Sequence, residues 1–221
     1  MPGRNIHRLV LLFAFAVTLT VGAPAAFPAP ASRSEALAAL DDPRTEQRAE
    51  AVVWLANHGQ MDDQPLLLKR LRDESAFVRG FAEQGLWLLW ARSGDTGIDG
   101  LMAAGVDQMQ AGSHKEAIAT FSEVIRRRPD FAEGWNKRAT VHYLASDFRK
   151  SLADCAEVIK RNPSHFGALS GYGQVYFQLE EYDQAIRWWK RALEVNPNMT
   201  GVEINIKGTE ELLKKRRGRA I

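Results

Sequence analysis

The sequence predicts an all-α fold, a right-handed solenoid of stacked helical hairpins, and three observations support this prediction. Three prolines recur at equal intervals, at Pro129, Pro163 and Pro197. Between them, apolar residues recur at spacings of three, four and seven, the period of a helix with one buried face. A second, shorter repeat aligns residues 40–55 with residues 71–86. Because one hairpin cannot bury its own apolar face, consecutive hairpins must stack.

The composition is that of a globular protein. Of 221 residues, 45% are hydrophobic and 25% are charged, which excludes a disordered chain, a collagen and a polytopic membrane protein. Lys and Arg number 29 and Asp and Glu number 27, so the net charge is +2. Such a balance gives no general attraction to nucleic acid or to anionic lipid. A single cysteine, Cys155, excludes an internal disulfide and a four-cysteine metal site.

The first residues have the layout of a secretory signal peptide. Arg4 and Arg8 form a basic start, an uncharged and mostly apolar run follows over 9–21, and prolines come soon after it. The run is shorter than the about 20 apolar residues that a membrane span needs. We therefore expect residues 1–25 to be a signal peptide, with cleavage up to residue 31 as a second option, and the protein to be exported, in a bacterium to the periplasm. The alternative is a retained N-terminal anchor that leaves the protein facing the periplasm.

Residues 32–92 are predicted to form a short helical array. In the shorter repeat Arg48 matches Arg79, and the second copy reads as a leucine-rich helix, an Asp turn and a Val-Arg helix. The pattern resembles HEAT-type helical repeats, although units of that family are usually about 40 residues long. An irregular helical domain is the alternative. The Gly-rich residues 93–97 are predicted to be a linker.

Residues 98–199 divide into three units of equal length, 98–131, 132–165 and 166–199. In each unit, small residues at the eighth and twentieth positions let two helices approach closely, and the proline stops the second helix. In the third unit the pattern is carried by Tyr172, Gly173, Tyr176, Ala185, Trp189 and Pro197. These residues resemble the tetratricopeptide repeat (TPR) family, whose pattern is W-x2-L-G-x2-Y, then A-x3-F, then P.

The first two units depart from the family pattern at a few positions. The second unit has Trp135 and Ala139, but Ser151 and Cys155 stand where Ala and an aromatic residue are usual. The first unit has Gln108 in place of the tyrosine of the first helix. The strict register of three units over about 100 residues still favours the resemblance.

The C-terminal residues are predicted to close the array. Residues 200–217 form one amphipathic helix, which a solenoid needs as a cap, and residues 218–221 form a basic tail. In the last repeat Trp188 occupies a position held by Thr120 and Asp154 in the other two units. Because a polar position is expected to be solvated, Trp188 is a candidate residue for an interface on the convex face; packing against the final helix is the alternative.

No motif for catalysis or cofactor binding stands out in the sequence. It has no G-x-x-x-x-G-K-[ST], G-x-G-x-x-G or G-x-S-x-G motif. The histidines lack the spacing of metal ligands, and Cys155 fills an apolar repeat position, which predicts a buried, unreactive thiol. We expect no enzyme activity, no metal and no cofactor. The alternative is an enzyme built in residues 32–97 from His58 and acidic residues.

The TPR resemblance implies a concave groove lined by the first helix of each unit, at repeat positions 2, 5, 9, 12 and 13. Some family members hold a terminal carboxylate with Lys and Asn at positions 5 and 9, which here carry no cation, so this clamp is predicted to be absent. The apolar and neutral side chains predict a peptide or amphipathic segment of a partner protein as the ligand. The candidate groove residues are Met102, Val106, Met109, Asn136, Thr140, Tyr143, Leu144, Ser170, Gln174, Phe177 and Gln178.

Groove binding has alternatives among other functions and partners. Residues 98–199 carry 13 basic and 13 acidic side chains, so the basic groove of an RNA-reading repeat is not expected. A structural or complex-assembly factor that uses the convex face and the basic tail is the main alternative. Membrane contact is expected only through an uncleaved signal or this tail. The groove itself has an alternative, in which the protein's own N-terminal array or cap covers it; the sequence does not predict the oligomeric state.

Overall fold

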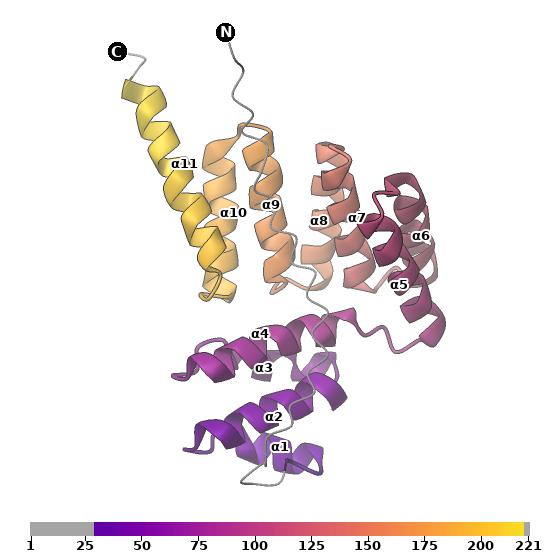
Figure 1. The fold of residues 1–221 in the computed structure, drawn as a ribbon, viewed down its shortest axis with the longest axis vertical. Coiled ribbons are helices and arrows are strands. Elements are labelled where there is room, and N and C mark those ends of the chain that lie inside the picture. Colours follow the sequence, from indigo (N-terminus) through magenta and orange to yellow (C-terminus); the bar gives the residue numbers. More distant parts are fainter. Residues whose placement is uncertain (1–28, 219–221) are drawn as a thin grey trace.

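The computed structural model describes residues 29–218, and Figure 1 shows its fold. In this range the chain forms eleven α-helices and no β-strand, which confirms the predicted all-α solenoid. The expected signal peptide and residues 219–221 of the expected tail lie outside the described residues. None of the helices between residues 29 and 218 is both long enough and apolar enough to cross a bilayer.

Two helix pairs form the N-terminal array. They are α1 (Arg33–Ala39) with α2 (Thr45–His58), and α3 (Gln64–Arg70), after a 3-10 turn (Met61–Asp63), with α4 (Ala76–Ala91). Apolar positions that the shorter repeat aligns are buried alike: Leu55 and Leu86 both have no exposed surface, and neither have Ala51 and Ala82. Equivalent helices in the two pairs therefore turn the same face to the core.

The aligned arginines also have equivalent places. Arg48 Nη1 donates to two backbone carbonyls of the turn before α2, and Arg79 Nη1 donates to two carbonyls of the turn before α4, at 2.9 and 3.1 Å in both cases. Each guanidinium also donates a hydrogen bond to the turn that follows its own helix pair in the stack. Arg48 Nε donates to the Asp73 carboxylate at 2.9 Å, whereas Arg79 Nε donates to Asn198 Oδ1 at 2.9 Å.

Three hairpins and a final helix follow. They are α5 (Thr96–Gln110) with α6 (His114–Arg127), α7 (Ala132–Leu144) with α8 (Phe148–Arg161), α9 (Phe166–Gln178) with α10 (Tyr182–Val195), and α11 (Thr200–Gly218), which packs on α10. Helix α5 begins before the predicted unit, at Thr96, because Asp95 Oδ1 accepts the backbone N–H groups of Gly97 and Ile98 at 2.8 and 3.1 Å. Such capping satisfies donors that the first turn leaves unpaired.

Small residues at the eighth repeat position bring the two helices of a hairpin together. A Cβ atom at Gly173 would lie 2.2 Å from the indole of Trp189, and one at Gly105 would lie 2.6 Å from the ring of Phe121. Both aromatic side chains are buried at 1% exposure or less. The missing side chain therefore makes room for the largest core residue of the same hairpin.

The turn inside each hairpin has one residue in the left-handed region. Gly112, Ser146 and Glu180, which occupy the same position in the three units, have φ angles of 75°, 62° and 60°. Only glycine adopts this conformation without steric cost. The second and third turns therefore carry a backbone strain that the first turn avoids.

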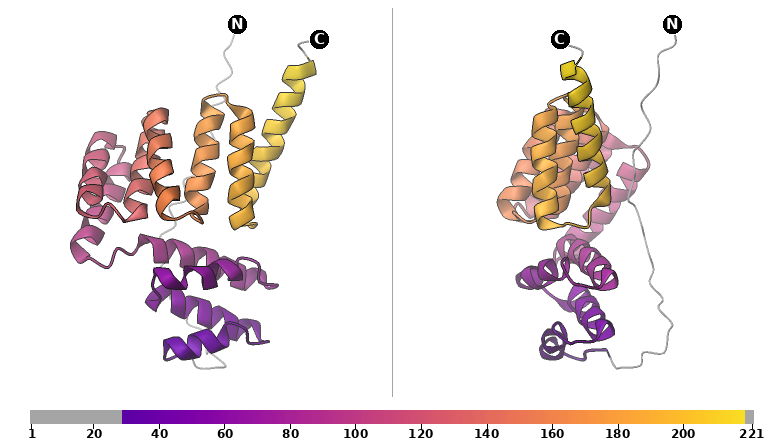
Figure 2. Two further views of the ribbon diagram at one scale, coloured as in Figure 1. Left: turned by 180° about the vertical axis from the view of Figure 1, so that it is seen from behind. Right: turned by 90° about the vertical axis from the view of Figure 1, so that its left-hand side faces the viewer.

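The N-terminal array packs against the lower turns of the second and third hairpins, and Figure 2 shows α4 lying beneath them. Trp90 stacks on His165 with ring centroids 4.3 Å apart, and Trp87 packs edge-on against Phe166 at 5.1 Å. The contact is tight, because a Cβ atom at Gly167 would lie 2.2 Å from Trp87. No feature of the sequence predicted this junction.

Polar contacts fix the same junction at the turn before α11. Asn198 Nδ2 donates to the carbonyl of Leu71 at 2.7 Å, and Arg72 Nη1 donates to the carbonyl of Val195 at 3.1 Å. Asn198 also accepts from Arg79, as described above. Arg48 of the first helix pair binds Asp73 of the second pair, and the equivalent Arg79 of the second pair binds Asn198. The turn before α11 therefore lies where a third helix pair of the N-terminal array would follow.

Candidate functional site

The candidate site is the inner face of the repeats, which we define as the face formed by α5, α7 and α9 at the predicted groove positions. Two predicted residues offer little surface there, which corrects the expectation. Met102 is 7% exposed because it belongs to the core of the first hairpin, and Asn136 is 8% exposed. The other nine predicted residues are half-buried (Val106, Met109, Tyr143, Leu144, Ser170, Gln174 and Phe177) or exposed (Thr140 and Gln178).

Three predicted residues meet between α7 and α9. The Tyr143 hydroxyl accepts from Gln174 Nε2 at 3.1 Å and from Gln178 Nε2 at 3.2 Å. A phenol that accepts two hydrogen bonds still has its own O–H to donate. The inner face therefore presents a neutral cluster of donors and acceptors, and nearby Thr140 is exposed to solvent.

A buried carboxylate lies at the base of the same face. Glu133, 2% exposed, accepts from Asn136 Nδ2 at 3.0 Å, and Lys137 Nζ lies 3.1 Å from its other oxygen. His165 Nδ1 accepts the backbone N–H of Ala168 at 3.1 Å, so its Nε2 carries the proton and donates to Glu133 at 3.1 Å. Burial raises the pKa of Glu133, but Lys137 and His165 together lower this pKa to about 2.

This cluster was missed by sequence reasoning, which treated His165 as one of several scattered histidines. The available signal was local: Glu133 in the first turn of a predicted helix, with Lys137 four residues later. Nothing local pairs Glu133 with His165, which is 32 residues away. The cluster ties α7 to the junction, because His165 also stacks on Trp90.

Two apolar residues at inner-face repeat positions, one on α9 and one on α11, differ in their exposure. Phe177 is only partly available, since its ring packs against Tyr182 at 5.4 Å and Trp189 at 5.9 Å. Ile204 on α11 is 68% exposed. It has the repeat position of Ser170 in a fourth, unfinished unit. The repeat period could have identified Ile204 had it been continued into the capping helix.

Trp188 is not a freely exposed residue of the convex face. Its indole is half-buried, stacks on Tyr172 with centroids 4.1 Å apart, and lies beneath the Arg191 guanidinium at 4.4 Å. It also does not pack against the final helix, since its cluster belongs to the second and third hairpins. The reason for expecting solvent was wrong: Asp154, at the same repeat position, is 4% exposed and pairs with Arg138.

The residues considered for chemistry are held in structural contacts. Cys155 is 3% exposed, and burial raises the pKa of its thiol to about 12. Asp63 and Asp73, which belong to the N-terminal enzyme alternative, form ion pairs with Arg33 and Arg48. Across residues 29–218, no three His, Cys, Asp or Glu side chains are grouped so that they could hold a metal ion.

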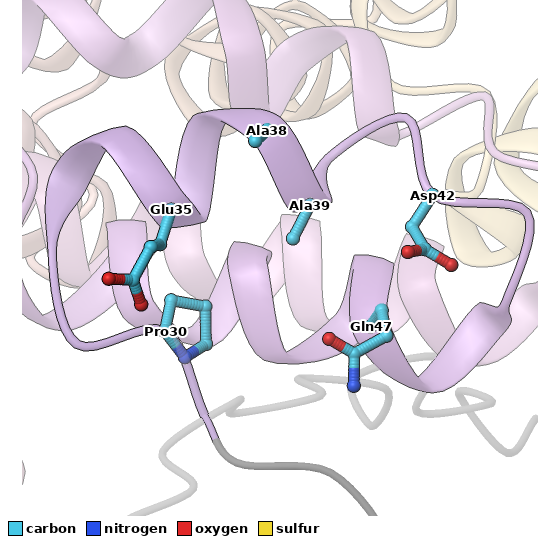
Figure 3. A pocket seen from close by; sticks show the side chains of 6 residues that line it. All are labelled: Pro30, Glu35, Ala38, Ala39, Asp42 and Gln47. Carbon is cyan, nitrogen blue, oxygen red and sulfur yellow. The ribbon is translucent and has the colours of Figure 1, made fainter.

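The pockets of the N-terminal array lie away from every predicted site residue. One, of about 300 Å³, is lined by small and polar side chains of α1, of α2 and of the segments before and between them (Figure 3), namely Pro30, Glu35, Ala38, Ala39, Asp42 and Gln47. Another, of about 400 Å³, borders the ion pairs of Arg48 and Arg70 with Asp73. Their walls carry charged and polar groups and no large apolar side chain, so neither resembles a site for an apolar ligand.

Known proteins resemble the hairpin region. Tetratricopeptide repeat models match residues 102–155 and residues 168–199. A TPR repeat-containing protein of Rhizobium etli is 32% identical over 130 residues, which cover 59% of this chain and 63% of that protein. The chain thus spans less than two thirds of the length of this relative.

Solved structures share the fold of this region. The first TPR of Spaghetti (RPAP3), bound to the HSP90 peptide SRMEEVD, superposes with a TM-score of 0.51 at 22% identity, covering 53% of this chain and 93% of that one. The Sgt2 TPR domain from Aspergillus fumigatus gives a TM-score of 0.54 at 17% identity, covering 57% and 85%. The hairpins that follow the N-terminal array share this fold, and tetratricopeptide repeats are matched within them over residues 102–155 and 168–199.

Proposed function

We propose that the protein binds an extended or helical segment of a partner protein on the inner face of its repeats. The observation that carries the proposal is the Tyr143–Gln174–Gln178 cluster, which bridges α7 and α9 and stands beside half-exposed apolar side chains. Neutral hydrogen-bonding groups among apolar side chains are the usual lining of a peptide site.

The chemistry of the face favours an internal segment over a free C-terminus. Lys137 is a cation of this face, and its ammonium already lies 3.1 Å from the Glu133 carboxylate. A ligand carboxylate would have to compete for Lys137 with the buried Glu133, which would then keep only His165 and Asn136 as partners, and weakening a buried ion pair in this way destabilises the fold. The SRMEEVD peptide bound by the RPAP3 repeat is acidic; we propose that this protein prefers a ligand with neutral and apolar side chains.

Site-specific photocrosslinking tests the proposal. A crosslinking amino acid at Thr140 or at Gln178 is expected to capture a partner, and one at Ala153, exposed on α8, is the matched control. A synthetic peptide with the captured sequence should then compete at both inner-face positions. With the crosslinker at one of these positions, an arginine at the other (Gln178→Arg or Thr140→Arg) should abolish capture without changing the helical circular dichroism. Equal capture from Ala153 would contradict the proposal.

We also propose that the protein is exported and acts without catalysing a reaction. The basic start and apolar run before residue 25 support export, and N-terminal sequencing of the mature chain from a cell fraction tests it. The equivalent hairpins of residues 33–91 support the HEAT-like interpretation of the N-terminal array. Conversion of a substrate by the wild-type protein that is lost on substitution of His58 or of a neighbouring carboxylate would contradict the absence of catalysis.

A further inference from the structure

Helix α4 has an exposed apolar ridge, which we define as Phe77, Phe81, Gln84 and Leu88. Phe77 is 59% exposed and Leu88 is 52% exposed, and Phe81 packs edge-on against Phe77 with centroids 4.6 Å apart. The spacings of four, seven and eleven positions place all four side chains along one stripe of the helix. At 1.5 Å per residue the stripe is about 16 Å long, which is three helical turns.

The rest of α4 is already occupied by the protein. One sector, with Val78, Ala82, Leu86 and Leu89, is buried in the core of the N-terminal array. A second sector, with Arg79, Trp87 and Trp90, contacts the lower turns of the repeats. The ridge is the remaining sector. Phe81 is half-buried and also packs against the core of the array, whereas Phe77 and Leu88 are exposed and belong to neither core.

The first helix pair shows that the fold does not need apolar residues at these positions. The offset of the shorter repeat, continued two residues past its end, aligns Glu46, Glu50, Val53 and Asn57 of α2 with the ridge of α4. Glu46 and Asn57 are exposed, as such residues are on a solvated face. Two helices with equivalent buried positions thus differ in this stripe, which is mainly acidic and polar in one and apolar in the other. An apolar stripe that folding does not require indicates a contact surface.

The neighbouring acidic residues indicate what covers the ridge. Equivalent packed helices lie about 8–10 Å apart, and α2 and α4 contact each other. A helix laid along the ridge is about 10 Å wide, so its flank would face Glu46 and Glu50. We propose that the α4 ridge docks an amphipathic helix of a partner protein, with an apolar seam on Phe77, Phe81 and Leu88 and a basic flank facing the α2 carboxylates.

A designed helical peptide tests this docking with the full chain. The probe is a fluorescent peptide of about 18 residues with a leucine seam and lysine flanks. A second peptide, used for comparison, has the same leucine seam but glutamate flanks. Anisotropy titrations at low salt should give the lysine peptide at least about tenfold tighter binding, because only its flank complements Glu46 and Glu50.

Variants of the protein identify the surface. Phe77→Ser with Leu88→Ser should weaken binding at least about tenfold, since it removes both exposed anchors. Met61→Ser, which removes another exposed apolar side chain away from the ridge (47% exposed), is the matched control and should bind normally. Glu46→Lys with Glu50→Lys should reverse the preference in favour of the glutamate peptide.

Four results would overturn the proposal. The first two are equal binding of the two peptides and unchanged peptide binding by the Phe77→Ser, Leu88→Ser variant. The third is a wild-type dimer that this variant converts to a monomer, and the fourth is peptide binding that appears only after residues 1–25 have been removed. The third result would assign the ridge to a second copy, and the fourth to the chain's own N-terminal segment. Thr140→Arg with Gln178→Arg should leave peptide binding at the ridge unchanged, so failure of this proposal is distinguishable from failure of inner-face binding.

Discussion

The junction between the two arrays predicts opposite effects for the same substitution at two glycines of α9. A Cβ atom at Gly167 would lie 2.2 Å from the Trp87 indole, whereas one at Gly171 would meet Cys155 Sγ at 3.7 Å, an ordinary contact. Both residues lie in α9, and Gly→Ala in the middle of a helix gains about 0.5–1 kcal/mol; Gly171 has this position, whereas Gly167 lies in the first turn and gains less. Most of the difference between the two variants therefore measures the contact with Trp87.

The expected magnitudes follow from this geometry. Overpacking a well-packed contact costs about 1–3 kcal/mol, and Gly167→Ala belongs at the upper end because the displaced indole also packs against Phe166. Gly167→Ala should lower the free energy of unfolding by about 1–2 kcal/mol after the helix gain is subtracted. Gly171→Ala should raise the free energy of unfolding by about 0.5–1 kcal/mol.

Thermal and urea unfolding, followed by circular dichroism and by tryptophan fluorescence, measures both effects. A difference of about 1.5–3 kcal/mol corresponds to melting temperatures about 3–12 °C apart for a chain of this size. Replacing Trp87 by Leu should remove most of the penalty of Gly167→Ala, so the double variant should be more stable than the sum of the single effects predicts. If Gly167→Ala proves as stable as Gly171→Ala, then α4 does not pack against the repeats as described.

Three further predictions concern single residues. Ser146→Gly should raise the free energy of unfolding by about 0.5–1 kcal/mol in urea denaturation, because Ser146 has a φ of 62° where the first turn has Gly112; a loss of stability would contradict the assigned turn. Cys155, with its pKa raised to about 12, should react with iodoacetamide in the native protein far more slowly than in urea, as read by mass spectrometry. The pKa of Glu133 is lowered from 4.5 to about 2, so its stabilisation is complete above pH 4.5 and is lost as the pH falls toward 2. Glu133→Gln should flatten this acid dependence of the melting temperature; an unchanged slope would assign the acid sensitivity to other carboxylates.

The sequence predicted the hairpins because their determinants are local and periodic. The close approach of Gly173 to Trp189 follows from a small residue and an aromatic residue sixteen positions apart in one unit. Repeat positions also predicted the inner-face residues, and nine of the predicted residues are at least partly exposed to solvent. Met102 and Asn136 differ because accessibility depends on neighbours outside the unit, which the repeat pattern does not describe.

The junction could not be predicted because its partners are far apart in sequence. Asn198 and Leu71 are separated by 127 residues, and no repeat relates them. Trp188 shows a second limit, since a polar residue at a repeat position was taken to mean solvent. Asp154 is buried at that position because Arg138 pairs with it, so a polar identity indicated a partner instead of water.

The place that Asn198 takes beside Arg79 has a mechanical consequence. The chain passes from the shorter to the longer repeat through residues 92–95, yet the hydrogen bonds of Asn198 link the two arrays at the turn before α11, near the far end of the chain. Force applied to the N-terminal helices would therefore reach the last hairpin directly through these bonds, as well as along the chain through the first two hairpins. A proteolytic cut at residues 92–95 should accordingly leave two fragments that stay together as one particle.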